Sequence, residues 1–232
     1  MARPRIAAAA ARPASNIPAR IHGLLVVLCL LANGDAFGVE VSFSVALEDG
    51  SAVAEAVVLV SPADATVARP VREAVIHEIR QANEEFIPKV IVVHPGDSVA
   101  FPNDDPVMHH VYSFSPAKTF QLHLYGRDDV PSVTFDQEGV VALGCNIHDH
   151  MRGYVYVTSA SASGVTGEDG IVNIPDLAPG SYQVSLWHPR LKHERAGKAI
   201  EVTQARSQTQ SLVLDLRVSR LGGLDKLQRT NY

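Results

Sequence analysis

Cysteine is scarce in this chain. Its 232 residues include two cysteines, and Cys29 lies in an N-terminal apolar run that we expect to be removed from the mature protein. Cys145 would then be the only thiol, which excludes an intramolecular disulfide. Because an unpaired thiol in an exported protein calls for a partner, we expect Cys145 to bind either another chain or a metal ion.

Long apolar segments are absent as well. The run at 24–32 is too short to span a bilayer, follows four arginines and precedes the small residues Ala32, Gly34 and Ala36. This order is typical of a secretory signal peptide, so residues 1–36 are predicted to be one. We therefore expect a periplasmic or secreted bacterial protein that has no stable membrane insertion after cleavage.

An excess of basic residues is also missing. Beyond residue 36 the chain holds 16 lysines and arginines against 24 aspartates and glutamates, a formal net charge of −8. Nucleic acid is therefore not an expected partner, since phosphate binding relies on positive charge. The sequence also lacks Gly-x-Ser-x-Gly, His-Glu-x-x-His and phosphate-loop motifs, so we expect a protein that is not an enzyme.

One short stretch concentrates the residues that carry chemistry. Cys145, His148 and Met151 follow one another at three-residue spacing, and a thiolate, an imidazole and a thioether are ligands that copper selects. The apolar run 139–143 before them and the alternating run 154–157 after them predict a tight loop between two strands. The alternative at this point is that Cys145 and Met151 are core residues and His148 a surface residue.

The remaining chain has the pattern of an all-β protein. Alternating or apolar runs at 39–45, 90–93 and 171–187 are separated by Gly and Pro turns at short spacing, which is typical of β-sandwiches. Residues 63–85 show no strand period and are interpreted as a connector in which 71–84 could form a short helix. The acidic pairs in the loops are interpreted as solvated; they are Glu84–Glu85, Asp104–Asp105 and Asp128–Asp129.

Residues 86–158 resemble a cupredoxin, a small blue-copper protein. The run Cys-x-x-His-x-x-Met-Arg-Gly-x-Val-x-Val resembles amicyanin more closely than plastocyanin, and Val-x-Pro-Gly-Asp-x-Val at 93–99 fits the same family. The wider sequence is similar to bacterial proteins labelled methylamine utilisation or plastocyanin-like. The resemblance implies a Greek-key β-sandwich with one type 1 copper ion, bound by His109, Cys145, His148 and Met151.

The chain departs from that family beside the expected ligands. His110 stands where amicyanin and plastocyanin have an Asn that ties the two ligand loops together. Asp149 and His150 replace an apolar pair beside the copper histidine. We interpret His110 and His150 as neighbours of the site or surface residues, and prefer Met151 to His150 as the axial ligand because of the loop spacing.

The flanking segments resemble a second module. Residues 167–189 are similar to the second half of a carboxypeptidase-regulatory-like, or transthyretin-like, β-sandwich, and residues 45–60 have the character of its first half. A hairpin alone cannot bury one face. We therefore expect residues 39–62 and 160–218 to form one sandwich with the cupredoxin domain inserted between them, followed by a tail at 219–232.

The resemblance implies an exported carrier of single electrons. Its copper ion would cycle between Cu(I) and Cu(II), and its partners would be periplasmic redox proteins such as a cytochrome c or a dehydrogenase. Two alternatives stay open: a copper-handling protein that sequesters or delivers the ion, and a β-sandwich binding module without a redox role.

Overall fold

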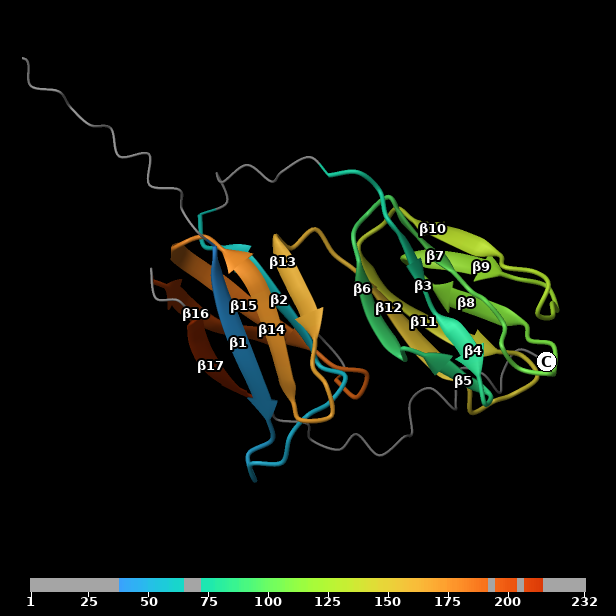
Figure 1. The fold of residues 1–232 in the computed structure, drawn as a ribbon, viewed down its shortest axis with the longest axis horizontal. Coiled ribbons are helices and arrows are strands. Elements are labelled where there is room, and N and C mark those ends of the chain that lie inside the picture. Colours follow the sequence, from blue (N-terminus) through green and yellow to red (C-terminus); the bar gives the residue numbers. More distant parts are fainter. Residues whose placement is uncertain (1–37, 65–71, 192–194, 204–206, 215–232) are drawn as a thin grey trace, which may run out of the picture. The chain divides into compact units, whose positions relative to one another are not determined.

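The computed structural model describes residues 38–64, 72–191, 195–203 and 207–214 (Figure 1). The expected signal peptide at 1–36 and tail at 219–232 lie outside these described residues. The described residues form strands arranged in five sheets, without a helix, so the predicted all-β class is confirmed. Within this part of the chain, no helix is long and apolar enough to cross a membrane.

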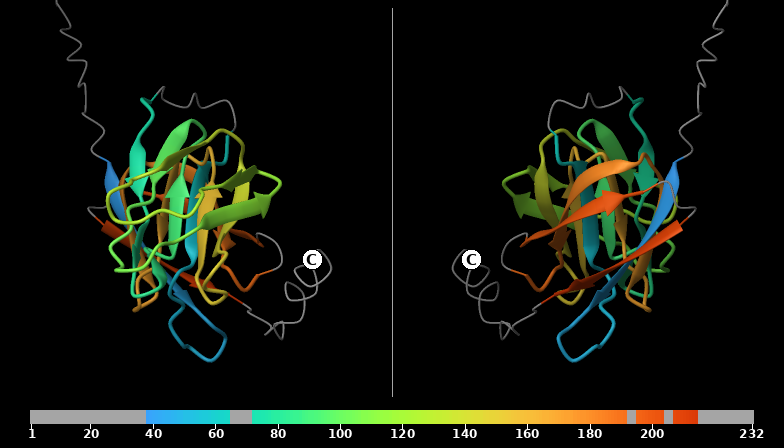
Figure 2. Two further views of the ribbon diagram at one scale, coloured as in Figure 1. Left: turned by 90° about the vertical axis from the view of Figure 1, so that its right-hand side faces the viewer. Right: turned by 90° about the vertical axis from the view of Figure 1, so that its left-hand side faces the viewer.

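Two sheets combine strands from both ends of the described chain. The first has the order β14-β1-β17 and the second the order β13-β2-β15-β16. Their strands are β1 (Val39–Ala46), β2 (Val57–Pro62), β13 (Ala162–Val165), β14 (Ile171–Leu177), β15 (Gly180–Trp187), β16 (Arg195–Val202) and β17 (Ser207–Val213). β1 and β17, blue and red in Figure 2, lie side by side as a parallel pair despite their distance in sequence.

The inward-facing residues of these two sheets form one core. β1 alternates buried and less buried residues, and its Val41, Phe43 and Val45 join Val58 of β2 and Ile174 of β14 in the same apolar cluster. The ladders thus connect residues 39–62 with residues 162–213, the two segments that we expect to share a sandwich. Their assignment to one regulatory-like domain stays a prediction.

The middle of the chain forms the other sheets. A five-stranded sheet has the order β6-β12-β11-β8-β9, a three-stranded sheet the order β10-β7-β3, and β4 pairs with β5. Their strands are β3 (Ile76–Glu78), β4 (Arg80–Ala82), β5 (Glu85–Ile87), β6 (Val90–Val93), β7 (Asp97–Ala100), β8 (Val111–Ser115), β9 (Lys118–Gln121), β10 (Ser132–Phe135), β11 (Gly139–Cys145) and β12 (Arg152–Val157). A second core includes Phe101, Phe135, Val141, Cys145 and Met151.

The suggestion of a short helix in residues 71–84 is wrong, because Ile76–Glu78 forms β3 and Arg80–Ala82 forms β4. β3 is held in parallel beside β7 by the buried carboxylate of Asp97. That carboxylate accepts hydrogen bonds from Arg72 Nη1 at 2.7 Å and the Val75 N–H at 2.9 Å, and it lies 2.9 Å from His77 Nε2. Three-residue strands are too short to show a period, so these long-range contacts leave no local signal.

A third apolar cluster contains residues from both groups of sheets. Val57 of β2 and Trp187 of β15 pack with Val90 of β6 and Tyr156 of β12. The Trp187 ring centroid lies 5.5 Å from those of Tyr154 and Tyr156. Aromatic pairs at this separation pack favourably, so this cluster adds to the apolar area that the fold buries.

Candidate metal centre

The candidate site forms where β11 turns into β12. Gly144 at the end of β11 lies opposite Arg152 at the start of β12, so the residues between them close a short loop. Inside the loop, the Met151 N–H donates to the His148 carbonyl at 2.9 Å. This bond closes a tight turn over residues 148–151.

His109 reaches the same place from the segment just before β8. β8 begins two residues later and pairs with β11, with Val111 opposite Cys145. On its other side His109 exchanges two backbone hydrogen bonds of 3.0 Å with Tyr125. The Asn146 N–H also donates to the His110 carbonyl at 3.1 Å, which ties the Cys145 loop to the His109 strand. Sheet pairing therefore brings His109 beside the loop.

A thiol and two imidazoles converge at this point. Cys145 Sγ lies 3.6 Å from His109 Nδ1 and 3.7 Å from His148 Nδ1, and the two Nδ1 atoms are 3.3 Å apart. His109 and Cys145 are buried, whereas the His148 side chain is 18% exposed. Among the described residues, these three form a group whose donor atoms are close enough to hold one metal ion.

The triangle has the size that a metal ion requires. Protein zinc sites have metal distances of about 2.0 Å to imidazole nitrogen and about 2.3 Å to thiolate sulfur. Three such donors around an ion in their plane would lie about 3.5 Å apart for the two nitrogens and about 3.7 Å apart for nitrogen and sulfur. The observed separations of 3.3, 3.6 and 3.7 Å fit a first-row transition metal.

The two candidates for a fourth ligand occupy different environments. Met151 is 1% exposed and belongs to the same apolar cluster as Cys145. The His150 side chain is 64% exposed, and its Nε2 lies 3.4 Å from the Glu84 carboxylate. Met151 is therefore an interior residue and His150 a surface residue, and the axial role of Met151 stays a prediction.

The other residues that depart from the cupredoxin pattern lie around the triangle. His110 is half-buried, and its Nε2 is buried without a hydrogen-bond partner among the described residues. Its ring centroid lies 6.3 Å from those of Tyr112 and His123. Asp149 is exposed. The structure does not bring either residue into the three-donor cluster.

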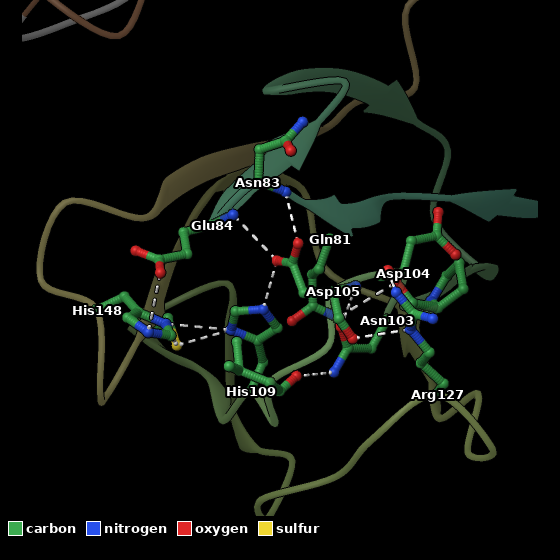
Figure 3. A network of polar contacts seen from close by, with 12 residues as sticks. Gln81, Asn83, Glu84, Asn103, Asp104, Asp105, His109, Arg127 and His148 are labelled. Atoms are coloured by element: carbon green, nitrogen blue, oxygen red, sulfur yellow. Dashed lines mark hydrogen bonds and ion pairs between the residues drawn. The ribbon is translucent and has the colours of Figure 1, made fainter.

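Asp105 corrects the interpretation of the acidic pairs as solvated, because this residue is 6% exposed. Its Oδ2 lies 2.8 Å from His109 Nε2 and accepts the Glu84 N–H at 3.0 Å, while its Oδ1 accepts the Asn83 N–H at 2.6 Å (Figure 3). Burial alone would raise the pKa of Asp105, but the hydrogen bonds from Glu84, His109 and Asn83 outweigh it and lower the pKa. Asn83 and Glu84 come from a turn more than 20 residues upstream, so local sequence does not reveal these two contacts.

Glu84 is the second residue that the sequence did not indicate. It lies in the turn between β4 and β5, where both Asn83 and Glu84 have φ of 57°. Its backbone N–H faces Asp105, and its carboxylate lies 3.7 Å from His148 Nε2 and 3.4 Å from His150 Nε2. The turn therefore contacts the surroundings of both imidazoles of the triangle.

No protein-family model and no curated protein matches the chain. Solved structures with similarity include the Cu-containing nitrite reductase from Thermus scotoductus SA-01, with 20% identity and a TM-score of 0.35 over 43% of this chain and 25% of that chain. A reduced mutant form of amicyanin has 23% identity and a TM-score of 0.33, over 35% of this chain and 80% of that chain. A purple cupredoxin from Nitrosopumilus maritimus has 23% identity and a TM-score of 0.32, over 35% of this chain and 99% of that chain. The chain thus spans a quarter of the nitrite reductase.

Proposed function

We propose that this protein carries single electrons between redox partners through one type 1 copper ion, bound by His109, Cys145, His148 and Met151. The observation that carries the proposal is the triangle of Cys145 Sγ and two imidazole Nδ1 atoms at separations of 3.3 to 3.7 Å. Two imidazoles and a thiolate with a weak thioether are the ligand set of blue-copper sites. When bound, copper supplies one-electron exchange between Cu(I) and Cu(II).

The protein's own contribution is to hold the donors still. Cys145 ends a strand that pairs with β8 and β12, and His109 is fixed by two backbone bonds to Tyr125. Donors that are held by a sheet keep one arrangement in both oxidation states, so little reorganisation accompanies each transfer. Met151 is buried in the same apolar cluster as Cys145, and the thiol is 2% exposed, so water has little access to it.

In this proposal, electrons enter and leave the metal site through His148. Its side chain is 18% exposed, whereas His109, Cys145 and Met151 are 2% exposed or less. A redox partner that docks over His148 would approach the site most closely. We propose small redox proteins, such as a cytochrome c or a dehydrogenase, as partners, and a periplasmic or secreted location. In this role the protein transfers electrons and does not itself act as an enzyme.

The test is the visible spectrum of the purified metal-free protein after Cu(II) is added. We expect one equivalent of copper to produce an intense thiolate-to-copper band that disappears on reduction and returns on oxidation. Cys145→Ser should abolish the band, and His150→Ala should keep it. Tight binding of Cu(I) without a blue oxidised form would instead favour a copper-handling protein, and the absence of copper binding would favour a binding module.

A further inference from the structure

The buried Asp105 carboxylate has two groups of hydrogen-bond partners. It contacts His109 Nε2 on one side and the backbone N–H groups of Asn83 and Glu84 on the other. It is not part of the three-donor cluster, because it meets the His109 ring at the nitrogen that faces away from Cys145. A carboxylate that accepts a hydrogen bond from the other nitrogen of a metal-binding histidine fixes the tautomer and orientation of its ring.

We propose that Asp105 is the positioning residue for His109, and that the Asn83–Glu84 turn holds Asp105 in place for this task. The inference rests on the proposed metal site, but it concerns the metal-free chain and can be tested without any redox activity.

The contact with Asp105 determines the tautomer of the His109 ring. An ionised carboxylate is only an acceptor, so the 2.8 Å contact requires a hydrogen on His109 Nε2. A neutral imidazole that carries its hydrogen on Nε2 has its lone pair on Nδ1, the nitrogen that points at Cys145 Sγ. Asp105 therefore keeps the ring in the one tautomer that can bind a metal at the triangle.

The backbone of Asp105 is itself held by several hydrogen bonds. Its own N–H donates to Asn103 Oδ1 at 2.9 Å, and Asn103 Nδ2 donates to the Val107 carbonyl at 2.8 Å and the Tyr125 carbonyl at 3.2 Å. Arg127 Nε donates to the Asp105 carbonyl at 3.0 Å. Asn103 thus links the backbone of Asp105 to Tyr125, the residue that forms an isolated β-bridge with His109.

The turn between β4 and β5 presents two backbone N–H groups to Asp105. Residues with positive φ are uncommon outside glycine, and two in succession at Asn83 and Glu84 place adjacent N–H groups on one side of the turn. Both groups donate to the same carboxylate, one to each oxygen. The Glu84 carboxylate lies 3.7 Å from His148 Nε2. Glu84 therefore contacts His148 through its side chain and Asp105, the partner of His109, through its backbone (Figure 3).

The arrangement predicts a loss when the carboxylate is replaced by an amide. In Asp105→Asn, one side-chain oxygen would have to serve three donors, and the new NH₂ group would meet a backbone N–H. The hydrogen on Nε2 would no longer be enforced, so His109 would populate both neutral tautomers. Changing such an outer partner typically lowers metal affinity by about 10- to 100-fold.

The first experiment needs no variant and no metal. Two-dimensional ¹H–¹⁵N spectra of the metal-free protein with labelled histidine report which ring nitrogen carries the hydrogen. We expect His109 to be the Nε2–H tautomer at neutral pH. A His109 ring with its hydrogen on Nδ1 would overturn the proposal.

The second experiment measures Zn²⁺ affinity by competition with a chelator, so copper redox chemistry is not involved. We expect Asp105→Asn to bind Zn²⁺ about 10- to 100-fold more weakly and to show mixed His109 tautomers. The matched control is Asp104→Asn, since Asp104 is the exposed neighbour that pairs with Arg80. It should bind Zn²⁺ like the wild type.

Glu84→Gln tests the Glu84 side chain separately from its backbone. The variant loses the carboxylate that faces His148 but keeps the backbone N–H that donates to Asp105. It should leave the His109 tautomer unchanged. Zn²⁺ affinity of folded Asp105→Asn within twofold of the wild type, with an unchanged tautomer, would overturn the proposal. Failure of copper to give a blue protein, with the His109 tautomer as expected, would instead count against the proposed function alone.

Discussion

Gly144 and Tyr112 lie opposite each other in the ladder between β11 and β8, and the tyrosine ring covers the glycine. A Cβ atom on residue 144 would lie 2.8 Å from Cζ of Tyr112 and 2.9 Å from its hydroxyl oxygen, which is closer than such atoms pack. The ring itself is flanked by Phe114, at a centroid distance of 5.2 Å, and by His110, at 6.3 Å. Gly144 immediately precedes Cys145, so the packing of Tyr112 against Gly144 helps to determine the position of the Cys145 thiol.

Gly144→Ala is therefore expected to destabilise the protein by about 1–2 kcal/mol, the usual cost of inserting one extra carbon into a packed place. Urea unfolding measures the change. In a Tyr112→Leu background the same substitution should cost less, because the atoms that it meets are gone. Gly126→Ala is the control, since a Cβ at residue 126 would meet no atom within 4 Å and the position does not require positive φ. Equal costs with and without the Tyr112 ring would show that the contact is not the cause.

Asp97 supplies a prediction about pH. Burial raises its pKa, but hydrogen bonds from Arg72, the His94 and Val75 backbone and His77 together hold its pKa far below the usual value. A carboxyl group whose pKa is lowered in the folded state stabilises the protein above its unfolded pKa of about 4, and this contribution disappears as the pH falls toward the folded pKa. The wild type should therefore lose stability progressively below about pH 4.

Asp97→Asn tests that contribution. At pH 7 we expect the variant to be less stable by about 2–3 kcal/mol, because hydrogen bonds to a buried charge are lost. The difference from the wild type should shrink as the pH is lowered below about 4. Unfolding by urea across pH 3 to 7 measures this difference, with Asp136→Asn, at an exposed carboxyl group, as the control. A difference that is independent of pH would mean that Asp97 is not ionised in the folded protein.

The parts of this fold that can be predicted are those with local signals. The alternation at 39–45 corresponds to β1, and the spacing of Cys145, His148 and Met151 places three candidate ligands in one short loop. His109 could be assigned only through the resemblance to cupredoxins, because its position depends on the pairing of β8 with β11. Nothing local to residue 109 indicates that pairing.

The parts that could not be predicted depend on contacts between distant segments. Asp105 has the sequence context of a solvated loop, yet its partners Asn83 and Glu84 lie 22 and 21 residues upstream. β3 is three residues long and is stabilised through Asp97, which follows it by about 20 residues. Short strands and buried acids are determined by tertiary contacts that override local preference.

Cys145 leads to a prediction about oxidation. The thiol is 2% exposed, and thiol–disulfide exchange requires access to the sulfur. The metal-free protein should therefore remain monomeric in air, and a bulky disulfide reagent should react with it at least about tenfold more slowly than in concentrated urea. Size-exclusion chromatography and absorbance measure the two outcomes, and Cys145→Ser identifies any reaction at another site. Rapid and complete dimerisation through Cys145 would support an intermolecular cross-link.

The axial ligand is tested by substitution at residue 151. Met151 is 1% exposed and lies in the same apolar cluster as Cys145, whereas the His150 side chain is 64% exposed, so we predict that Met151 is the axial ligand. Met151→Leu removes a donor that favours Cu(II) more than Cu(I), so the reduction potential should rise. Met151→Gln offers a harder oxygen and should lower it. A shift of about 59 mV corresponds to one decade in the relative affinity for the two oxidation states, and we expect shifts of about that size or more.

Both variants should stay blue because Cys145 is intact, and His150→Ala should change the potential only slightly. Voltammetry in which the Met151 variants leave the potential unmoved while His150→Ala shifts it would assign the axial position to His150.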